Sequence, residues 1–466
     1  MKIERPTNHN FYGEEGIPEE NLRKEFGIRY KKQEKQIEDM FSSVFELDTK
    51  SARLEILRFR KTKEEPHPDE EGQLILRLYR KYKDSQYQYF IQTGLFAGVL
   101  YQESCQFNIT ARQGGTVFLH RMLNFVNDIY IDTEHTEAKE SQEQNEFQQI
   151  IAYLFIQSLE KSAILGLPKV YQNRAQRSSK VRGSIDIKTY LKKDIPFRGV
   201  LTTKYRELVF VQEIVDVLYM ACRILEKNFG RQIHRKILSV YQLLRQNYSN
   251  RYPKSDTIRK ARGHVVLHNP AYSGFKNTLK YAEIILQQNN LFRSDQSSTL
   301  TTHGYLFDIA QLFEVYLEKL LARYFTDWEV TGQTELRVYQ GQFYGRRMLP
   351  DLVMRHKKTG KVIVFDAKFK RMAFTKNDVD RGDFYQIHSY LQYYYPDVLF
   401  GGLIYPLSRP INTDKAYSEQ LWENEKHSTK FIVDGIFVTE EMTMTDIRTE
   451  EEGFIHRIRE LISSCS

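Results

Sequence analysis

The stretch MLPDLVMRHKKTGKVIVFDAKFK, residues 348–370, constrains the fold most, because its two apolar runs predict a buried β-hairpin. The turn KKTG supplies a glycine for a left-handed position. Pairing His356 with Lys361 across this turn sets a register that places Asp351 directly opposite Asp366. Two carboxylates that face each other across a sheet repel, and a cation between them would make the arrangement tolerable.

Lys368 belongs to the same group of side chains. Successive strand residues alternate faces, so Asp366 and Lys368 point the same way as Val362 and Val364. Hard oxygen ligands such as paired carboxylates suit Mg²⁺ or Mn²⁺. The alternative places Asp351 and Asp366 at strand ends in solvent with Lys368 as a surface partner, since an Asp-x-Lys triplet is common by chance.

A helix predicted upstream, GYLFDIAQLFEVYLEKLLARYF over residues 304–325, carries a further carboxylate. Its apolar side chains fill one arc, and Glu314 falls at the border of that arc. Such a glutamate could reach past the edge of the core to a metal on the adjoining sheet. The alternative is a rim glutamate that extends into water.

A second predicted helix, RGDFYQIHSYLQYYYP over residues 381–396, follows the hairpin and stops at its proline. Gln386 and Tyr390 are four residues apart and therefore share a face. This polar pair could orient the lysine of the hairpin or touch a phosphate. The alternative is an ordinary amphipathic helix that is rich in aromatic residues.

Length and the order of predicted elements indicate several domains, because 466 residues exceed what one hydrophobic core usually supports. We expect a charged arm over residues 1–49 and a β-rich domain over 50–145. A helical middle domain over 146–299 and an α/β domain over 300–466 follow. The predicted class is multidomain α+β, and the C-terminal domain should hold a mixed sheet flanked by helices.

Composition indicates where the protein is located and which kinds of partner it can bind. The balance of 68 basic against 60 acidic residues gives a net charge of +8, which permits contact with nucleic acid without requiring it. Three cysteines without CxxC spacing argue against a disulfide framework and a structural zinc site. The polar N-terminus and the lack of a long apolar run predict neither a signal peptide nor a membrane span. We expect a cytoplasmic protein.

The order of these motifs resembles the PD-(D/E)XK nuclease superfamily in its RecB-like branch. The matching residues are Glu314, Pro350-Asp351, Asp366-Ala367-Lys368 and Gln386-x-x-x-Tyr390. The resemblance implies that Asp351 and Asp366 bind Mg²⁺ or Mn²⁺, with the Ala367 carbonyl as a further ligand and Glu314 in support. Such an ion generates a nucleophilic hydroxide for phosphodiester hydrolysis, and Lys368 could position the water or stabilise the developing charge.

Other segments resemble the McrC family, the endonuclease subunits of McrBC-type modification-dependent restriction systems. The resemblance covers roughly residues 90–466, whereas the first 50 residues are unmatched and the usual Asn after YREL is absent. It rests on FDIAQLFEVYLEKLL, on QFNITARQGGTVFLHRML (106–123), on KVRGSIDIKTYL (180–191) with Arg182, Gly183 and Asp186, and on YRELVFVQEIVDVLYMACRIL.

This second resemblance implies an assembly that defends against foreign, modified DNA. The chain would dock on a hexameric AAA+ GTPase like McrB and stimulate it, and the β-rich domain over residues 50–145 would contact this partner. Arg112 and Arg182 would be among the contacting residues, and assembled complexes could dimerise through the nuclease domain. The sequence agrees, because it has no G-x-x-x-x-G-K-[ST] loop, and its Gly360-Lys361 pair is followed by Val. We therefore expect no nucleotide to be bound by this chain.

Basic side chains offer candidate contacts to DNA. Arg346 and Arg347 precede Asp351 and could clasp a DNA strand, with Lys370 beyond the hairpin, or they could belong to a charged edge strand. The basic stretch QNRAQRSSKVRG, residues 172–183, is interpreted as a loop that touches DNA phosphate or an acidic partner surface, with a solvated loop as the alternative.

Two other functions stay open at this stage. The chain could be a stand-alone RecB-like repair nuclease, or a non-catalytic adaptor that activates a motor. The complete set of Asp351, Asp366 and Lys368 argues against the adaptor, because nucleases that have lost activity commonly lose one member of the set.

Overall fold

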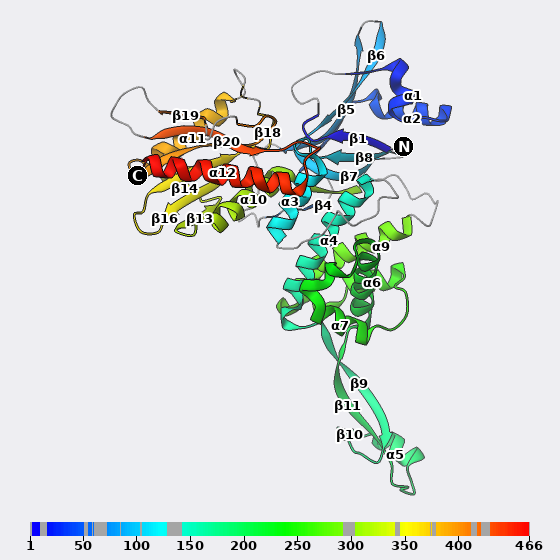
Figure 1. Cartoon of the computed structure of the whole chain (residues 1–466). Helices are drawn as coiled ribbons and strands as arrows, with labels where there is room; N and C mark the ends of the chain where they lie inside the picture. Colours follow the sequence, from blue (N-terminus) through cyan, green and yellow to red (C-terminus); the bar gives the residue numbers. More distant parts are fainter. Residues whose placement is uncertain are drawn as a thin grey trace. The chain divides into compact units, whose positions relative to one another are not determined.

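The chain has mixed α and β structure in two compact units, as the computed structural model shows (Figure 1). The first unit combines Met1–Asp128 with Ser298–Ser466, and the second is Ile129–Ser297. The structure describes residues 2–9, 16–50, 55–57, 59, 72–83, 85–102, 105–127, 142–291, 303–340, 345–372, 374, 379–411, 417–420 and 429–465. No helix among these residues has the length and apolar character that crossing a membrane would require.

Two sheets formed mainly by the N-terminal part lie in the first unit. One has five strands in the order β1 (Lys2–Pro6), β8 (Cys105–Thr110), β7 (Phe96–Gln102), β12 (His303–Asp308) and β4 (Glu55–Leu57). The other has four, in the order β2 (Ile17–Pro18), β6 (Gln86–Thr93), β5 (Leu74–Lys83) and β3 (Phe45–Asp48). The helices of this part are α1 (Leu22–Glu25), α2 (Lys31–Ser42) and α3 (Gly115–Asn127).

The first residues do not form the charged arm that the sequence predicted over 1–49. Strand β1 pairs in parallel with β8, and the apolar side chains of this segment enter the core around the two sheets. Ile3, Phe26, Ile37 and Phe41 are each at most 2% exposed. These apolar residues are few and widely spaced among charges, so composition hides a segment that the fold buries.

Strand β12 also departs from the prediction, which had a single helix over 304–325. Residues 303–308 pair instead with β7 and β4, so the start of the expected C-terminal domain completes an N-terminal sheet. The helix α10 (Ile309–Tyr324) begins only after Asp308, whose side chain accepts a hydrogen bond from the Gln311 amide at 3.0 Å. This pairing joins the expected β-rich and C-terminal regions in one compact unit.

A mixed six-stranded sheet carries the C-terminal part of the first unit. Its order is β13 (Trp328–Gly332), β16 (Leu352–His356), β17 (Val362–Ala367), β18 (Val398–Leu407), β20 (Lys430–Phe437) and β19 (Tyr417–Gln420). The three strands β17, β18 and β20 are parallel, and the remaining pairs are antiparallel. A ribbon of β14 (Leu336–Gln340) and β15 (Gly345–Met348) lies between β13 and β16 in sequence.

Helices flank this sheet. Helix α11 (Arg381–Tyr394) connects β17 to β18 and packs its Ile387 and Tyr390 into the same core as Val362 and Val364. Helices α10 and α12 (Met444–Cys465) also pack against strands of the sheet, α10 on β13 and β17 and α12 on β20. All six residues of β17 are therefore buried.

A buried ion pair ties α12 to the sheet. Arg457 donates from Nε and Nη2 to the Asp434 carboxylate of β20, at 2.9–3.1 Å, and from Nη2 to the Gly435 carbonyl at 2.9 Å. Both side chains are at least nine-tenths buried. Burial raises the pKa of Asp434, and the bonds from Arg457 oppose that shift.

The second unit combines helices with a long hairpin that the sequence did not predict. Its helices are α4 (Gln142–Ser162), α5 (Ile187–Lys193), α6 (Gln212–Phe229), α7 (Leu238–Asn247), α8 (Ser255–Arg262) and α9 (Phe275–Leu291). Strands β9 (Lys169–Ser178) and β11 (Leu201–Phe210) pair along their whole length, and β10 (Ser184–Ile185) adds to β11. Residues 169–178 thus form a strand, whereas the sequence predicted a loop over part of this range. The strand is exposed on both faces, so its sequence has no apolar period that would indicate it.

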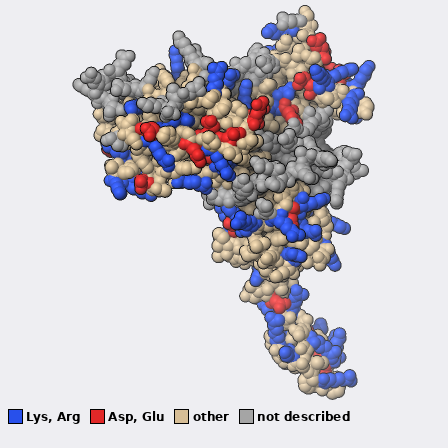
Figure 2. Space-filling view, viewed as in Figure 1, with Lys and Arg blue, Asp and Glu red and all other residues tan. Residues whose placement is uncertain are grey.

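The far end of this hairpin is basic and partly apolar. Figure 1 shows β9 and β11 extending from the helices of the unit, with α5 beside their distal end. Lys and Arg gather there in Figure 2. The exposed cations there include Lys180, Arg182, Lys188, Lys192, Lys193 and Arg198, and among the exposed apolar side chains are Ile187 at 67% and Phe197 at 59%.

Candidate active site

The hairpin of β16 and β17 has the register that the sequence predicted. Leu352 pairs with Phe365, and the His356 amide donates to the Lys361 carbonyl at 2.8 Å. Asp351 lies just before β16 and Asp366 lies near the end of β17. One carboxylate is fixed by the backbone of the other strand, because the Ala367 amide donates to Asp351 Oδ2 at 2.8 Å.

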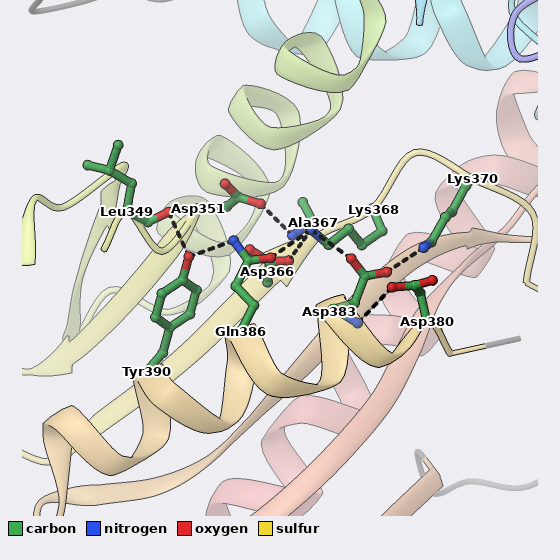
Figure 3. A network of polar contacts seen from close by, with 11 residues as sticks. Leu349, Asp351, Asp366, Ala367, Lys368, Lys370, Asp380, Asp383, Gln386 and Tyr390 are labelled. Atoms are coloured by element: carbon green, nitrogen blue, oxygen red, sulfur yellow. Dashed lines mark hydrogen bonds and ion pairs between the residues drawn. The ribbon is translucent and has the colours of Figure 1, made fainter. Parts of the chain in front are cut away.

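Lys368 lies beside this carboxylate pair (Figure 3). Its Nζ is 2.6 Å from Asp366 Oδ2 and donates to Gln386 Oε1 at 3.1 Å. Asp366 is 1% exposed, whereas the Lys368 side chain is 21% exposed. Lys368 therefore lies on the same side as Asp366, as the strand alternation predicted, and it contacts Gln386, as was also predicted.

Helix α11 supplies the polar pair predicted from its sequence. Gln386 Nε2 donates to the Tyr390 hydroxyl at 2.8 Å, and that hydroxyl donates to the Leu349 carbonyl at 3.3 Å. The two side chains therefore link Lys368 with the backbone just before Asp351. Burial raises the pKa of Tyr390 to about 12, and the negative charge of Asp366 adds to the shift, so the hydroxyl is a neutral donor.

Glu314 reaches the cluster through a residue that the sequence analysis missed. Gln333 donates from its side chain to Glu314 Oε2 at 3.1 Å and from its backbone to the Asp351 carbonyl at 3.1 Å. Glu314 is half-buried at the edge of α10, as the helical arc predicted. Gln333 follows strand β13 with a φ of 45°, and nothing in its sequence context indicates that role.

Asp383 is the second missed residue. Its Oδ1 is 3.3 Å from Lys368 Nζ, and its Oδ2 forms an ion pair with Lys370. A spacing of three residues on one helix puts Asp383 on the same side as Gln386, which was the available signal. Lys370, predicted to contact DNA, has its ammonium on this carboxylate.

The electrostatics of the cluster are those of carboxylates crowded together. Burial raises the pKa of Asp351 well above its usual range, and the charges of Glu314 and Asp366 raise it further. Burial also raises the pKa of Asp366, against the opposing effect of Lys368. For Lys368, burial is the largest single influence and would lower the pKa, yet the combined effects of Asp366, Asp383 and Asp351 outweigh burial and raise it. The lysine is therefore a fixed cation beside two carboxylates that resist ionisation together.

The donor set suits a divalent cation with an incomplete protein shell. Asp366 Oδ2 is buried and has no hydrogen-bond partner among the described residues, although the Lys368 ammonium is its charge partner. No group of three or more His, Cys, Asp or Glu side chains within the described ranges could hold a metal alone. Mg²⁺ commonly uses one or two carboxylates and leaves its other positions to water and phosphate. Asp351, Asp366 and the Ala367 carbonyl fit that requirement.

The predicted DNA-contacting arginines lie on strand β15, which precedes Asp351. Arg346 and Arg347 pair across to β14 in the two-stranded ribbon. Arg347 is exposed, and its Nη1 is 3.9 Å from the Glu335 carboxylate. This placement leaves the Arg347 side chain accessible to a ligand.

The two arginines proposed for partner contact are both exposed. In the first unit, Arg112 donates from Nη1 to the Asn8 carbonyl at 2.9 Å. In the second unit, Arg182 lies 4.2 Å from the ring centre of Tyr205 and donates to Glu207 at 3.3 Å. The motif RGSID thus shapes the distal part of the hairpin, where Gly183 has a φ of +79° that favours glycine.

Asp186 completes that motif. It accepts hydrogen bonds from the amide and hydroxyl of Thr189, at 3.4 and 2.8 Å, and so begins helix α5. Its carboxylate is also 2.9 Å from Lys204 of β11. The residues that carried the sequence resemblance here therefore hold α5 against the hairpin.

Fold and site together define a mixed α/β protein with a pair of carboxylates and a lysine at the end of a central hairpin. A family model described as "McrBC 5-methylcytosine restriction system component" matches residues 91–406. The chain belongs to this family and is a subunit of a restriction system, and its expected kinship with the McrC family is confirmed.

One solved structure has a similar fold over its whole length. A chain in the half-complex of the tetradecameric assembly of Thermococcus gammatolerans McrB AAA+ hexamers with bound McrC matches with a TM-score of 0.53 and 13% identity. The match covers 99% of this chain and 100% of that one. A chain of the Thermococcus gammatolerans McrBC complex matches with a TM-score of 0.31 and 13% identity, covering 70% and 88%. No curated protein gives a significant match.

Proposed function

We propose that this chain is the endonuclease subunit of an McrBC-like restriction complex and hydrolyses DNA phosphodiester bonds with Mg²⁺ or Mn²⁺. One observation carries the proposal: Asp351, Asp366 and Lys368 come together in the predicted register at the end of a buried hairpin. Ionisation of these buried carboxylates costs free energy, as their raised pKa values indicate, and a bound divalent cation would offset that cost. The domain that carries them would be a PD-(D/E)XK nuclease domain.

The roles divide by charge. Asp351, Asp366 and the Ala367 carbonyl would hold the cation, with Glu314 in support through Gln333. When bound, the cation would lower the pKa of water and screen the phosphate charge. Lys368 would present its ammonium to the attacking water or to a phosphate oxygen, where a fixed cation stabilises charge that develops in the transition state.

Gln386 and Tyr390 would keep this lysine and the Asp351 segment in place. The amide oxygen of Gln386 accepts from Lys368, and its nitrogen donates to the Tyr390 hydroxyl. Because Tyr390 in turn donates to the Leu349 carbonyl, one chain of hydrogen bonds spans both sides of the site. A shift of about 1 Å in such a group can lower the rate by roughly a hundredfold.

The motor would come from another chain. The related Thermococcus gammatolerans structure contains McrB AAA+ hexamers with bound McrC, whereas the present sequence has no phosphate-binding G-x-x-x-x-G-K-[ST] loop. We infer that this chain binds no nucleotide and stimulates a hexameric AAA+ GTPase. The exposed basic hairpin with Arg182 offers a surface for that contact, and Arg112 offers a second one.

DNA contact would involve the basic residues around the site. Arg346 and Arg347, which belong to β15, and Lys370, which follows β17, would contact the phosphate backbone, which such side chains bind without reading sequence. Recognition of the modified base would belong to the partner. The complex would thereby act on foreign, modified DNA, and assembled complexes could pair through their nuclease domains.

The test is cleavage of plasmid DNA containing methylated cytosine by the chain with its AAA+ partner, GTP and Mg²⁺. We expect cleavage by the wild type and its loss in Lys368→Ala. Asp397→Asn, which changes a carboxylate that is 63% exposed, should cut normally. Equal cutting by Lys368→Ala and the wild type would show that the site is misassigned.

The same assay separates the alternatives. Efficient cutting without the partner would indicate a stand-alone repair nuclease. Stimulation of the partner without any cutting by the wild type would indicate an adaptor. Robust GTP hydrolysis by the isolated chain would contradict the assignment of the motor to another subunit.

A further inference from the structure

Asp383 holds the two lysines of the site from the first turn of α11. Its carboxylate lies between Lys368 and Lys370 in Figure 3, with Oδ1 3.3 Å from Lys368 Nζ and Oδ2 bonded to Lys370. The side chain is only 15% exposed. Because Lys370 binds Oδ2, the orientation of the carboxylate is fixed and Oδ1 faces Lys368.

The Lys368 ammonium has three oxygen neighbours in this arrangement. They are Asp366 Oδ2 at 2.6 Å, Gln386 Oε1 at 3.1 Å and Asp383 Oδ1 at 3.3 Å. The first of these oxygens belongs to a carboxylate that would bind the cation. A divalent cation on Asp366 would repel the ammonium and compete with it for Oδ2.

We propose that Asp383 is a positioning residue that takes over the Lys368 ammonium when a divalent cation binds Asp366. This inference rests on the proposed metal-dependent function. With Asp383 present, the lysine leaves Asp366 for a second carboxylate and stays within the site. Without it, a neutral amide is the alternative acceptor, and the lysine competes with the cation for Asp366.

An acidic residue in the first turn of a helix also has an ordinary explanation, since it stabilises the helix dipole. Asp380 provides a matched comparison at the same helix start. Its Oδ1 accepts from the Gly382 amide at 2.7 Å and caps α11. Asn caps helices as well as Asp does, so Asp380→Asn removes a nearby negative charge while keeping the cap.

The experiment measures Mn²⁺ binding to the full chain by calorimetry, without DNA or turnover. Asp383→Asn should weaken Mn²⁺ binding by about fivefold or more, within the range of coupling between contacting residues. Asp383→Glu should restore much of the affinity, and Asp380→Asn should change it by less than about twofold.

A double-mutant cycle identifies the route of the effect. In a Lys368→Ala background, Asp383→Asn should change Mn²⁺ affinity by less than about twofold, because no lysine competes for Asp366. An equal loss in both backgrounds would overturn the inference, since Asp383 would then act by its charge or by supporting the helix. Unchanged Mn²⁺ affinity in Asp383→Asn would overturn it as well.

Failure of the underlying function has a different signature. If the wild type shows no Mn²⁺ binding that Asp366→Asn abolishes, both the proposed metal site and this inference fall. If such binding exists and Asp383→Asn leaves it unchanged, only the inference falls.

Discussion

Two antiparallel hairpins of this chain use the same secondary structure in opposite ways. In the hairpin of β16 and β17, every residue of β17 is buried and the polar groups are fixed by neighbours. In the hairpin of β9 and β11, most residues of β9 are exposed, and charged and apolar side chains face water. The first is suited to hold a small ion in a set geometry, and the second to meet a large surface.

The contrast shows where a polar residue is informative. An aspartate inside an apolar strand is costly to bury, so its presence indicates a specific use. A cation on an exposed strand costs little and indicates only a candidate contact. Asp366 thus supports a sharper hypothesis than Arg182 does, and the variants below test the two hairpins against each other.

The largest expected effect is on cleavage. Asp366→Asn should lower DNA cleavage by the complete complex by at least about a thousandfold, because the variant loses a carboxylate that we propose binds the metal. Stimulation of the partner's GTP hydrolysis should stay at the wild-type level, since the β9–β11 hairpin is unchanged. Cleavage and GTP hydrolysis are measured on the same samples, and a parallel loss of both would erase the functional distinction between the hairpins.

The buried ion pair tests whether the sheet that carries the site behaves as one core. Arg457→Met leaves Asp434 buried without its partner and should lower the free energy of unfolding by about 3–5 kcal/mol. Hydrogen exchange should increase in β20 and β17 and change little in α6 of the other unit. Arg459→Met, on the exposed side of α12, is the matched control and should change stability by roughly 0.5 kcal/mol or less.

The other hairpin is tested at Gly183. A Cβ there would lie 2.3 Å from the Lys204 carbonyl oxygen, at a φ of +79°, so Gly183→Ala must distort the hairpin near Arg182. A strain of about 1–3 kcal/mol should weaken stimulation of the partner's GTPase by roughly tenfold.

Gly166 is the control for that substitution. Its φ is +86° and a Cβ added there would have no atom within 4 Å, so Gly166→Ala shares the backbone penalty without the clash. Mn²⁺ binding should be normal in both variants. Normal stimulation by Gly183→Ala would remove the hairpin from the partner contact.

The smallest effect is on the stability of the metal-free chain. Asp351→Asn removes a buried charge and keeps an acceptor for the Ala367 amide, so we expect a melting temperature higher by roughly 2 °C at neutral pH. Added Mg²⁺ should stabilise the wild type and not the variant. Thermal unfolding with and without Mg²⁺ measures both effects.

The sign of the pH dependence follows from the raised pKa of Asp351, which burial causes first and the charges of Glu314 and Asp366 increase. Above the unfolded pKa, near 4, the unfolded chain ionises Asp351 more readily than the folded chain does. The wild type therefore loses stability as the pH rises above that value. The advantage of Asp351→Asn should therefore be absent below about pH 4 and grow as the pH rises towards the folded pKa. An advantage that is independent of pH would point to packing instead of charge.

The sequence contained most of the site and only part of the fold. The turn at Gly360 and the alternation along β17 were enough to predict the pairing of His356 with Lys361, because register follows from local geometry. The helical arc likewise placed Glu314 at the edge of α10. These are short-range features, and periodicity reports them well.

Long-range pairings could not be obtained in that way. β1 and β12 join a sheet with strands distant in sequence, and such a pairing is not reported by the pattern within one segment. β9 has exposed residues on both faces, so it lacks the period that marks a half-buried strand. Gln333 and Asp383 were missed for a related reason. Their roles arise from contacts made by the folded chain, to Glu314 in one case and to two lysines in the other.

The proposed nuclease activity requires that Asp351 and Asp366 share a divalent cation. The most direct measurement is anomalous X-ray scattering from crystals of the chain soaked in Mn²⁺. We expect a peak between the two carboxylates and beside the Ala367 carbonyl in the wild type, and none there in Asp366→Asn. No peak at saturating Mn²⁺, or an equal peak in the variant, would contradict it.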